Sequence, residues 1–314
     1  MSRPLPQVAP AAHPAARCAL AIGVALTLTA CAERAPTESA VASAPSAARA
    51  GFDQPGMHRQ YGAPVRVGDG RARAYVVYDQ KQGGAPLEVG VALDERALDG
   101  LRAPAPHDGD DGPGEHLDSD VALLPLPPRG ATPFEFVELD WNPGGHEPPG
   151  IYDLPHFDFH FWTTSREERA SIVPTNPRWA ALAEALPPDA ERPPHYSVPG
   201  PPAAVAVPLM GVHWLDVRSP ELQPPGSAAH RPFSTTFIYG SWAGRFVFLE
   251  PMITRAHLLA KKGAVDPAVR DEVLPIATPA AVRTSGYYPS AYRITWDARA
   301  REYRVALTQL ARRG

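Results

Sequence analysis

The chain has 314 residues, 44% of them apolar, and a formal net charge of −4. This composition is typical of a globular protein that buries a full hydrophobic core. The sequence has no block of basic residues of the kind that follows a phosphate backbone, so it indicates no nucleic-acid partner. Most of the 39 prolines stand between candidate elements, which favours strands with stiff connections over a helical bundle.

The N-terminus has the pattern of a secretory signal peptide. Arg3 and Arg17 precede the apolar run "CALAIGVALTLT", which is too short for a membrane span of ~20 residues. The next residues, "LTAC", resemble the bacterial lipobox, in which the cysteine, here Cys31, carries a lipid. We therefore expect a lipoprotein signal peptide over 1–31, export, and a lipid anchor that binds the cell-envelope membrane. Ala32 in place of aspartate indicates the outer membrane, facing the periplasm; cleavage at an A-x-A site, which would release a secreted protein, is the alternative.

Cysteine chemistry is excluded in the exported part of the chain. Cys18 lies within the expected signal peptide and Cys31 at its end, and the sequence has no other cysteine. A disulfide, a cysteine-ligated zinc site, an iron–sulfur cluster and a cysteine nucleophile therefore cannot form there.

The rest of the chain divides into a tether and one expected domain. Residues 32–54 are small and polar and predict a flexible tether. Residues 55–314 predict a single β-rich domain, mainly antiparallel and sandwich or barrel-like, with a few short helices. An α+β fold is the alternative.

Patterns along this domain predict its individual elements. Strands are expected at 64–79, 85–94, 133–141, 155–162, 203–217, 233–240 and 245–251, the last two joined as a hairpin by "SWAG". Short helices are expected at 94–101, 164–172, 176–186 with Asn176 as the cap, 254–262 and 267–273. Residues 291–310 predict a closing hairpin, or a strand followed by a helix.

The stretch "PHFDFHFW", residues 155–162, carries the clearest functional signal. Alternation along a strand places His156, Asp158, His160 and Trp162 on one face and three phenylalanines on the other. The phenylalanine face predicts core. The other face must hold a polar cavity, a hydrogen-bonded network or a ligand site, because buried polar groups need partners.

Reach along the strand limits how a metal ion could bind there. His156 and His160 are four positions apart, which is ~13 Å, whereas an imidazole with its metal bond spans only ~6–7 Å from Cα. We therefore expect one histidine to bind the ion with Asp158 and the other to support the site. His213 or Glu250 must then lie within a few ångströms of Asp158 to complete the ligand set.

Residues from several parts of the chain make up the predicted site. The expected metal ligands are His156, Asp158, His160, His213 and Glu250, a nitrogen and oxygen set that suits zinc, manganese or iron. Glu250 is expected on the same strand face as Phe246 and Phe248. Supporting or pocket residues are His146 and Glu147, in the loop "GGHEPPG", together with Trp162 and Trp214.

Two acidic residues near this strand have two interpretations. Glu138 and Asp140 lie two apart on one face of "FEFVELDW", where they could pair as carboxylates. A solvated strand face explains them equally well.

Three functions fit these patterns. The first is an exported protein with a single divalent metal ion, which could serve a metal-dependent enzyme whose substrate the sequence does not identify. The second is a non-catalytic envelope protein that self-assembles, with the His–Asp–His row as a structural network. The third is a binding module whose pocket of Trp141, Trp162, Trp214 and Tyr239 holds an apolar ligand. The sequence lacks the G-x-S-x-G, Walker and G-x-G-x-x-G motifs.

Three blocks resemble a known bacterial family. "LDWNPGGHEPPGIYDLPHFDFHFW", "MGVHWLD" with "SPE", and "TTFIYGSWAGRFVFLEPMIT", spanning roughly residues 138–255, are similar to the signature blocks of a family of unknown function. That family is catalogued after an uncharacterised Thermus protein, and its members are exported or lipid-anchored. The resemblance implies a β-rich single domain that can form homo-oligomers, without an established activity or site residues.

Overall fold

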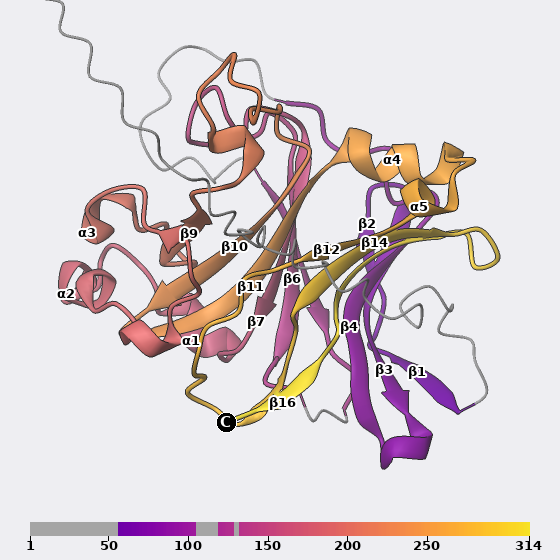
Figure 1. Ribbon diagram of the computed structural model, residues 1–314, viewed down its shortest axis with the longest axis horizontal. Helices are drawn as coiled ribbons and strands as arrows, with labels where there is room; N and C mark the ends of the chain where they lie inside the picture. The colour runs from indigo at the N-terminus through magenta and orange to yellow at the C-terminus, as the bar shows by residue number, and fades with distance from the viewer. Residues whose placement is uncertain (1–55, 105–118, 129–131) are drawn as a thin grey trace, which may run out of the picture. The chain divides into compact units, whose positions relative to one another are not determined.

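Two antiparallel sheets make up most of the computed structural model, which describes residues 56–104, 119–128 and 132–314. Sheet A has the order β1-β3-β4-β15-β14-β12, and β2 pairs with β3. Its strands are β1 (Met57–Tyr61), β2 (Val65–Val67), β3 (Gly70–Asp79), β4 (Ala85–Asp94), β12 (Asp271–Pro275), β14 (Ala291–Asp297) and β15 (Glu302–Thr308). Figure 1 shows that this sheet combines the N-terminal and C-terminal strands of the described chain.

Sheet B is formed by the central part of the chain. Its order is β5-β6-β7-β11-β10-β9-β8. Its strands are β5 (Asp120–Pro125), β6 (Phe136–Asn142), β7 (His156–Trp162), β8 (Tyr196–Ser197), β9 (Val212–Asp216), β10 (Thr235–Trp242) and β11 (Arg245–Thr254). A separate two-stranded sheet pairs β13 (Gly286–Tyr288) with β16 (Ala311–Arg313).

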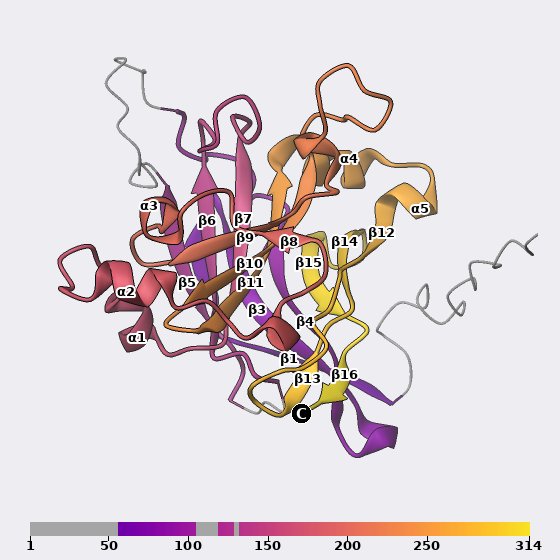
Figure 2. The ribbon, with the colours of Figure 1, turned by 60° about the vertical axis from the view of Figure 1, so that its left-hand side comes forward.

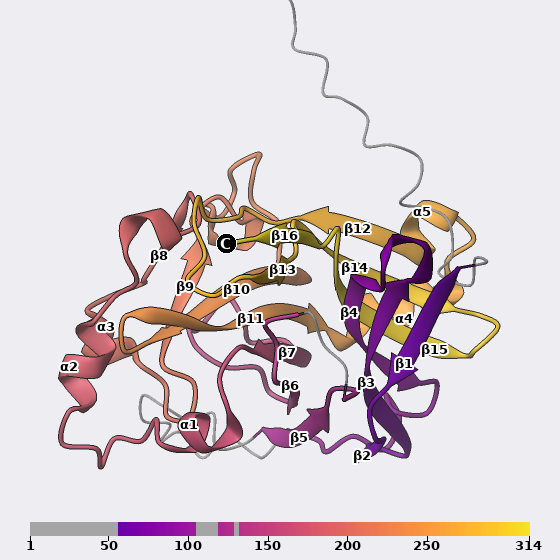
Figure 3. The same ribbon diagram turned by 90° about the horizontal axis from the view of Figure 1, so that it is seen from below.

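The helices of the described chain are few and short. They are α1 (Arg166–Ala170), α2 (Trp179–Glu184), α3 (Pro202–Val205), α4 (Arg255–Gly263) and α5 (Pro267–Arg270), with the 3₁₀ turns η2 (Gln80–Gln82), η4 (Asp189–Glu191) and η5 (Pro220–Leu222). Figures 2 and 3 show α1, α2 and α3 beside the strands of sheet B, and α4 and α5 beside β12 and β14. The expected β-rich, antiparallel fold with a few short helices is confirmed.

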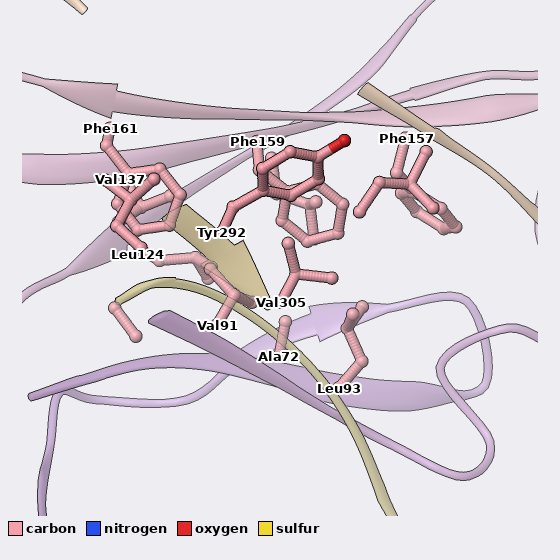
Figure 4. Close-up of a cluster of buried hydrophobic side chains, with 14 of the residues drawn as sticks. Ala72, Val91, Leu93, Leu124, Val137, Phe157, Phe159, Phe161, Tyr292 and Val305 are labelled. Carbon is pink, nitrogen blue, oxygen red and sulfur yellow. The ribbon is translucent and has the colours of Figure 1, made fainter. Parts of the chain in front are cut away.

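The two sheets pack face to face over one hydrophobic core, as in a β-sandwich. Strand alternation supplies the inner face of each sheet, and the side chains of Phe157, Phe159 and Phe161 are 0% exposed. Figure 4 shows these phenylalanines pointing from β7 toward Val91 and Leu93 of the other sheet. The expectation that the phenylalanine face of β7 belongs to the core is confirmed.

Three of the expected elements differ in the structure. The helix expected at 94–101 is a turn, because the Asp94 carboxylate accepts hydrogen bonds from the backbone amides of Arg71 and Arg96 and so competes with a helix. The strand expected at 203–217 is α3 followed by β9. The helix expected from Asn176 begins only at Trp179 (in α2), because the Asn176 side chain accepts from the amide of Arg178 in a turn.

Other expectations hold, except that a fourth element, the helix expected at 267–273, is shorter than expected. The hairpin at "SWAG" joins β10 to β11, and α4 covers the expected helix at 254–262. The helix expected at 267–273 ends early, since α5 is followed directly by β12. The C-terminal alternative is decided in favour of a hairpin, formed by β14 and β15.

Candidate functional site

The polar face of β7 lies on the side of sheet B that points away from the sandwich core, and yet it is buried. His156 and His160 are 0% exposed and Asp158 is 2% exposed. Two apolar clusters flank this face. One surrounds Trp162 and Trp242 near α1, α2 and α3, and the other surrounds Tyr152 and Phe233 from the loops before β7 and β10.

Neighbouring strands extend the polar face of β7 into a row. In the pairing of β6 with β7, Glu138 lies opposite His160, Asp140 opposite Asp158, and Asn142 opposite His156. Glu250 joins them from β11, and every one of these side chains is buried. We call the seven residues the polar row; they are Glu138, Asp140, Asn142, His156, Asp158, His160 and Glu250. The interpretation of Glu138 and Asp140 as a solvated strand face is therefore wrong.

One end of the row forms a first group, His146, His156 and Asp158, whose candidate ligand atoms all lie within 4.8 Å of one another. Nε2 of His156 is 3.2 Å from Oδ1 of Asp158, and Nε2 of His146 is 3.3 Å from Oδ2. Each Nδ1 contacts a backbone carbonyl, that of Glu147 at 2.8 Å for His146 and that of Leu154 at 2.6 Å for His156. A carbonyl only accepts, so both Nδ1 atoms carry a hydrogen and donate.

This anchoring determines what the two imidazoles offer to the carboxylate. Nε2 of His146 forms a hydrogen bond with Oδ2 of Asp158 at 3.3 Å, which requires a proton on one of the two atoms. In the neutral state Nε2 of His156 carries a lone pair that faces Oδ1 of the same carboxylate, which has no hydrogen to donate when ionised. Nε2 of His156 and Oδ1 of Asp158 are close but form no hydrogen bond. Such a contact is repulsive unless a cation, either a proton or a metal ion, lies between the atoms.

The charges in the first group respond to this proximity. Burial would raise the pKa of Asp158, but His156 and His146 hold that pKa well below its usual range. Burial lowers the pKa of His146, but the hydrogen bond and charge of Asp158 outweigh it and raise that pKa above the ordinary value. Asn142 also donates to Oδ2 of Asp158 at 2.7 Å, which fixes the carboxylate.

A second group, His160, His213 and Glu250, lies further along the row, and its candidate ligand atoms also lie within 4.8 Å of one another. Nε2 of His160 is 3.5 Å from Oε1 of Glu250, and Nε2 of His213 is 3.8 Å from Oε2. On the other side of the His160 ring, Nδ1 is 3.1 Å from Oδ2 of Asp140. Both nitrogens of His160, both oxygens of Asp140 and Oε2 of Glu250 are buried without a hydrogen bond.

Beyond the second group, an arginine closes the row. The Arg169 guanidinium, from α1, pairs with both oxygens of Glu138, and Trp162 donates from Nε1 to the same carboxylate at 2.8 Å. Burial and the nearby Asp140 carboxylate nevertheless raise the pKa of Glu138 to about 7. The pKa values of Asp140 and Glu250 lie well above their usual range, because burial and then the neighbouring carboxylates penalise the charged forms.

The row therefore has a surplus of acidic groups. Four buried carboxylates, those of Glu138, Asp140, Asp158 and Glu250, face a single guanidinium among the described contacts, that of Arg169. Buried charges are stable only when they are paired, protonated or bound to a metal ion. Protons on the histidines and carboxylates, or bound cations, must supply the missing positive charge.

The structure divides the five predicted metal ligands between the two groups. His156 and Asp158 belong to the first, whereas His213 and Glu250 approach His160 and not Asp158. The expected single site, completed at Asp158 by His213 or Glu250, is therefore not formed. The two groups stay separate because Asp158 and His160 are two positions apart along β7, which is ~6.6 Å.

The supporting residues divide in the same way. His146 contacts Asp158 directly, whereas Glu147 contributes its backbone carbonyl and has an exposed side chain. Trp162 stacks on His160, with 6.1 Å between ring centroids. Trp214 lies on the opposite face of sheet B, in the sandwich core, because it follows His213 by one residue along β9.

Phe246 also lies on the face opposite to the expected one. Between Gly240 and Ser241 the register of β10 and β11 shifts by a bulge. This irregularity leaves Phe248 beside His160 but turns Phe246 toward the sandwich core.

The binding-module interpretation required four aromatic residues to line one pocket. Trp162 lies on one face of sheet B, and Trp141, Trp214 and Tyr239 lie in the core on the other. A cavity of about 450 Å³ includes Tyr239, and another of about 320 Å³ includes Trp141. Neither of these cavities includes a residue of the polar row, and the expected single aromatic pocket is wrong.

Sequence reasoning missed several members of the row. The sequence patterns indicate neither Asn142 nor Arg169, which pairs with Glu138 at the end of the row, and they do not connect Glu138 and Asp140 with β7. The signal was present in "FEFVELDWN", where acidic and amide side chains alternate with apolar ones immediately before the histidine strand in sheet order.

Two glycines position the histidines at the edges of the row. Gly145 precedes His146 and has φ +79°, and a Cβ there would lie 2.2 Å from the carbonyl oxygen of Tyr152. Gly211, two residues before His213, has φ +95°, and a Cβ there would lie 2.5 Å from the carbonyl oxygen of Ser241. Only glycine allows the backbone to approach so closely at positive φ.

Comparisons with known proteins give no match to any family model, curated protein or solved structure. Among residues 56–104, 119–128 and 132–314, no helix is long and apolar enough to cross a membrane. The expected signal peptide with Cys31 and the expected tether lie outside the described residues.

Proposed function

We propose that this protein binds a divalent transition-metal ion through Nε2 of His146, Nε2 of His156 and the carboxylate of Asp158. The carrying observation is the geometry of the two histidines, whose Nδ1 atoms are anchored on backbone carbonyls while their Nε2 atoms approach one buried carboxylate. Metal-binding histidines are held in this way, with the second ring nitrogen donating to a carbonyl or carboxylate.

The distances support an ion between these atoms. Two ligand atoms, each ~2.1 Å from a tetrahedral ion, are ~3.4 Å apart, and the two nitrogen–oxygen distances in the group are 3.2 and 3.3 Å. Two imidazoles and one carboxylate suit zinc, manganese or iron. Because three protein ligands leave a coordination position open, a water molecule would complete the site.

The proposal is tested by metal titration of the full chain, purified in detergent without a polyhistidine tag and stripped with a chelator. Zinc alone is expected to bind the wild type with an affinity that Asp158→Ala lowers at least 100-fold. His146→Ala is expected to lower it at least tenfold, and it should fold normally because this side chain lies at the edge of the row and is 10% exposed.

His58→Ala is the matched control, because His58 is an exposed histidine on β1 of sheet A. It should bind zinc like the wild type. A wild type that binds no zinc, or an Asp158→Ala variant that binds it unchanged, would leave the first group as a structural network with protonated histidines. That result would support the alternative of a non-catalytic envelope protein.

An enzyme is the second candidate function, and the open coordination position next to the partly exposed His146 favours it. A bound ion would act as a Lewis acid on a substrate oxygen at that position. Hydrolysis of an activated ester by the zinc-loaded wild type, abolished in Asp158→Ala and retained in His58→Ala, would support this candidate. Equal rates in the wild type and Asp158→Ala would refute it for that substrate.

The cellular location is part of the same proposal. The basic start, the short apolar run and "LTAC" support export and a lipid on Cys31. Mass spectrometry of the mature protein should find a lipid-modified N-terminal cysteine. A mature N-terminus at Glu33, without lipid, would instead show cleavage at the A-x-A site and secretion.

A further inference from the structure

We infer that His160, His213 and Glu250 form a second binding site for a divalent transition-metal ion, separate from the first group. This inference extends the proposed function, because it takes the first ion to occupy His146, His156 and Asp158. The three new ligands come from strands β7, β11 and β9 of sheet B, and β10 lies between β11 and β9. The site is therefore fixed by the sheet and not by a loop.

Unpartnered buried atoms indicate a ligand at this place. His160 is 0% exposed and Glu250 is 1% exposed. Both nitrogens of His160 and Oε2 of Glu250 lack a hydrogen bond, although the large majority of buried side-chain polar atoms in folded proteins have one. A metal ion would satisfy Nε2 of His160 and the Glu250 carboxylate together.

The distances in the second group also fit one ion. Glu250 is 3.5 Å from Nε2 of His160 and 3.8 Å from Nε2 of His213. Ligands of one tetrahedral ion are ~3.4 Å apart, so both contacts of Glu250 are within a few tenths of an ångström of that separation. The candidate ligand nitrogens of His160 and His213 lie within 4.8 Å of each other. His213, with 16% of its side chain exposed, lies at the edge of the row.

Charge supports a second cation independently of distance. Arg169 neutralises Glu138, and an ion in the first group neutralises Asp158. Asp140 and Glu250 are then still buried without a cation. The first ion has one positive charge beyond that of Asp158, so it balances only one of these two carboxylates, and a second divalent ion or a proton must balance the other.

Asp140 lies between the two sites and is inferred to be a positioning residue for both. It is the cross-strand partner of Asp158, and its Oδ2 is 3.1 Å from Nδ1 of His160. These two atoms form no hydrogen bond as they are placed, but they would form one when an ion binds Nε2, since metal-binding histidines donate their other N–H to a carboxylate or carbonyl. The negative charge of Asp140 would also reduce the repulsion between two ions held ~6–7 Å apart along β7.

The number of ions bound by variants of the full chain tests this inference. The wild type, titrated with zinc alone, is expected to bind two equivalents. Glu250→Gln and Asp158→Asn are each expected to bind one, and the double variant none. If Glu250→Gln does not fold, His213→Ala at the edge of the row replaces it.

Cobalt(II) provides a readout of each site besides stoichiometry. Its visible absorption in the wild type should fall by about half in either single variant, because each tetrahedral N/O site contributes its own band. Asp140→Asn should keep both bands but require at least tenfold more metal for each. If Asp140→Asn loses the cobalt band of one site and keeps the other unchanged, Asp140 does not position the ligands of both sites.

The outcomes separate the two proposals. A single equivalent that is lost in Asp158→Asn and kept in Glu250→Gln would overturn the second site and leave the first intact. A single equivalent lost only in Glu250→Gln would overturn the first site and leave the second. Two equivalents retained in Glu250→Gln would also overturn the second site, and His58→Ala should match the wild type throughout.

Discussion

The outer faces of the two sheets both bury carboxylates, but they neutralise them differently. On sheet A, Glu88 faces Arg293 at 3.6 Å and accepts from the hydroxyl of Tyr75 at 2.5 Å. Glu302 accepts from Arg304 at 2.9 Å and from Arg73 at 2.7 Å. On sheet B, four carboxylates meet one guanidinium and several imidazoles.

This difference distinguishes a structural network from a ligand site. Arginine is always charged and donates in a planar fork, so its pairs with carboxylates are complete without any other group. Imidazole is neutral at ordinary pH unless its surroundings raise its pKa. The neutral ring offers a lone pair on one nitrogen. Sheet A therefore neutralises its carboxylates mainly with arginines, although Oε2 of Glu88 has no hydrogen bond and burial raises the pKa of Glu88, whereas sheet B requires protons or metal ions.

The largest expected effect breaks the network of sheet A. Arg293→Met removes the cation that faces Glu88 and that donates to Asp271 at 2.5 and 2.6 Å. It should lower the free energy of unfolding by about 3–5 kcal/mol, because a buried carboxylate loses its partner. Urea unfolding measures the loss, and added zinc should not restore it.

The double variant Glu88→Gln with Arg293→Met is the control for that experiment. It removes the buried charge together with its partner, so it should recover a substantial part of the lost stability. A loss below about 1 kcal/mol in Arg293→Met, as for an exposed pair, would show that sheet A is not held by this network.

An intermediate effect is expected at the loop that holds His146. Gly145→Ala places a Cβ against the Tyr152 carbonyl oxygen at positive φ, and the displacement of His146 should weaken zinc binding about tenfold. Calorimetric titration measures this change. Gly150→Ala is the matched control, since Gly150 has φ +80° in the same loop with no atom within 4 Å of a Cβ; equal weakening in both variants would contradict the assigned role of His146.

The smallest effect concerns a carboxylate on the sheet A side. Hydrogen bonds from His257 at 2.8 Å and Lys261 at 2.6 Å lower the pKa of Glu272 to about 2, against burial, from its ordinary 4.5. Its stabilisation is full above pH 4.5 and disappears as the pH falls toward 2, because the folded state binds the proton less readily than the unfolded state.

Glu272→Gln should therefore lower the free energy of unfolding at pH 7 by about 1 kcal/mol, since solvent screens part of the interaction. The difference from the wild type should vanish near pH 2. Urea unfolding at several pH values measures it, and a difference that grows toward low pH would have the wrong sign for this pair.

Much of the fold could be predicted because local patterns and tertiary packing agree. The alternation in "HFDFHFW" decides the two faces of β7, and "SWAG" marks the hairpin of β10 and β11. The helix expected at 94–101 does not form, because the Asp94 carboxylate accepts hydrogen bonds from a backbone amide of β3 and from one in its own turn. That contact crosses strands and leaves no periodic trace in the sequence.

The site could be predicted only in part for a similar reason. The sequence identifies His156, Asp158 and His160, and the strand rise limits which of them share an ion. It does not show that β6 lies beside β7, which places Asp140 and Asn142 in the row. Nor does it show the bulge near Gly240 that separates Phe246 from Phe248.

Strand β7 carries residues of both the hydrophobic core and the candidate site. Its phenylalanines are fully buried between the sheets, and its histidines and aspartate alternate with them. The amide hydrogens of this strand should therefore exchange only through global unfolding. The ligand geometry is then set before any ion arrives, and an ion encounters a preorganised site whose conformational entropy was already lost during folding.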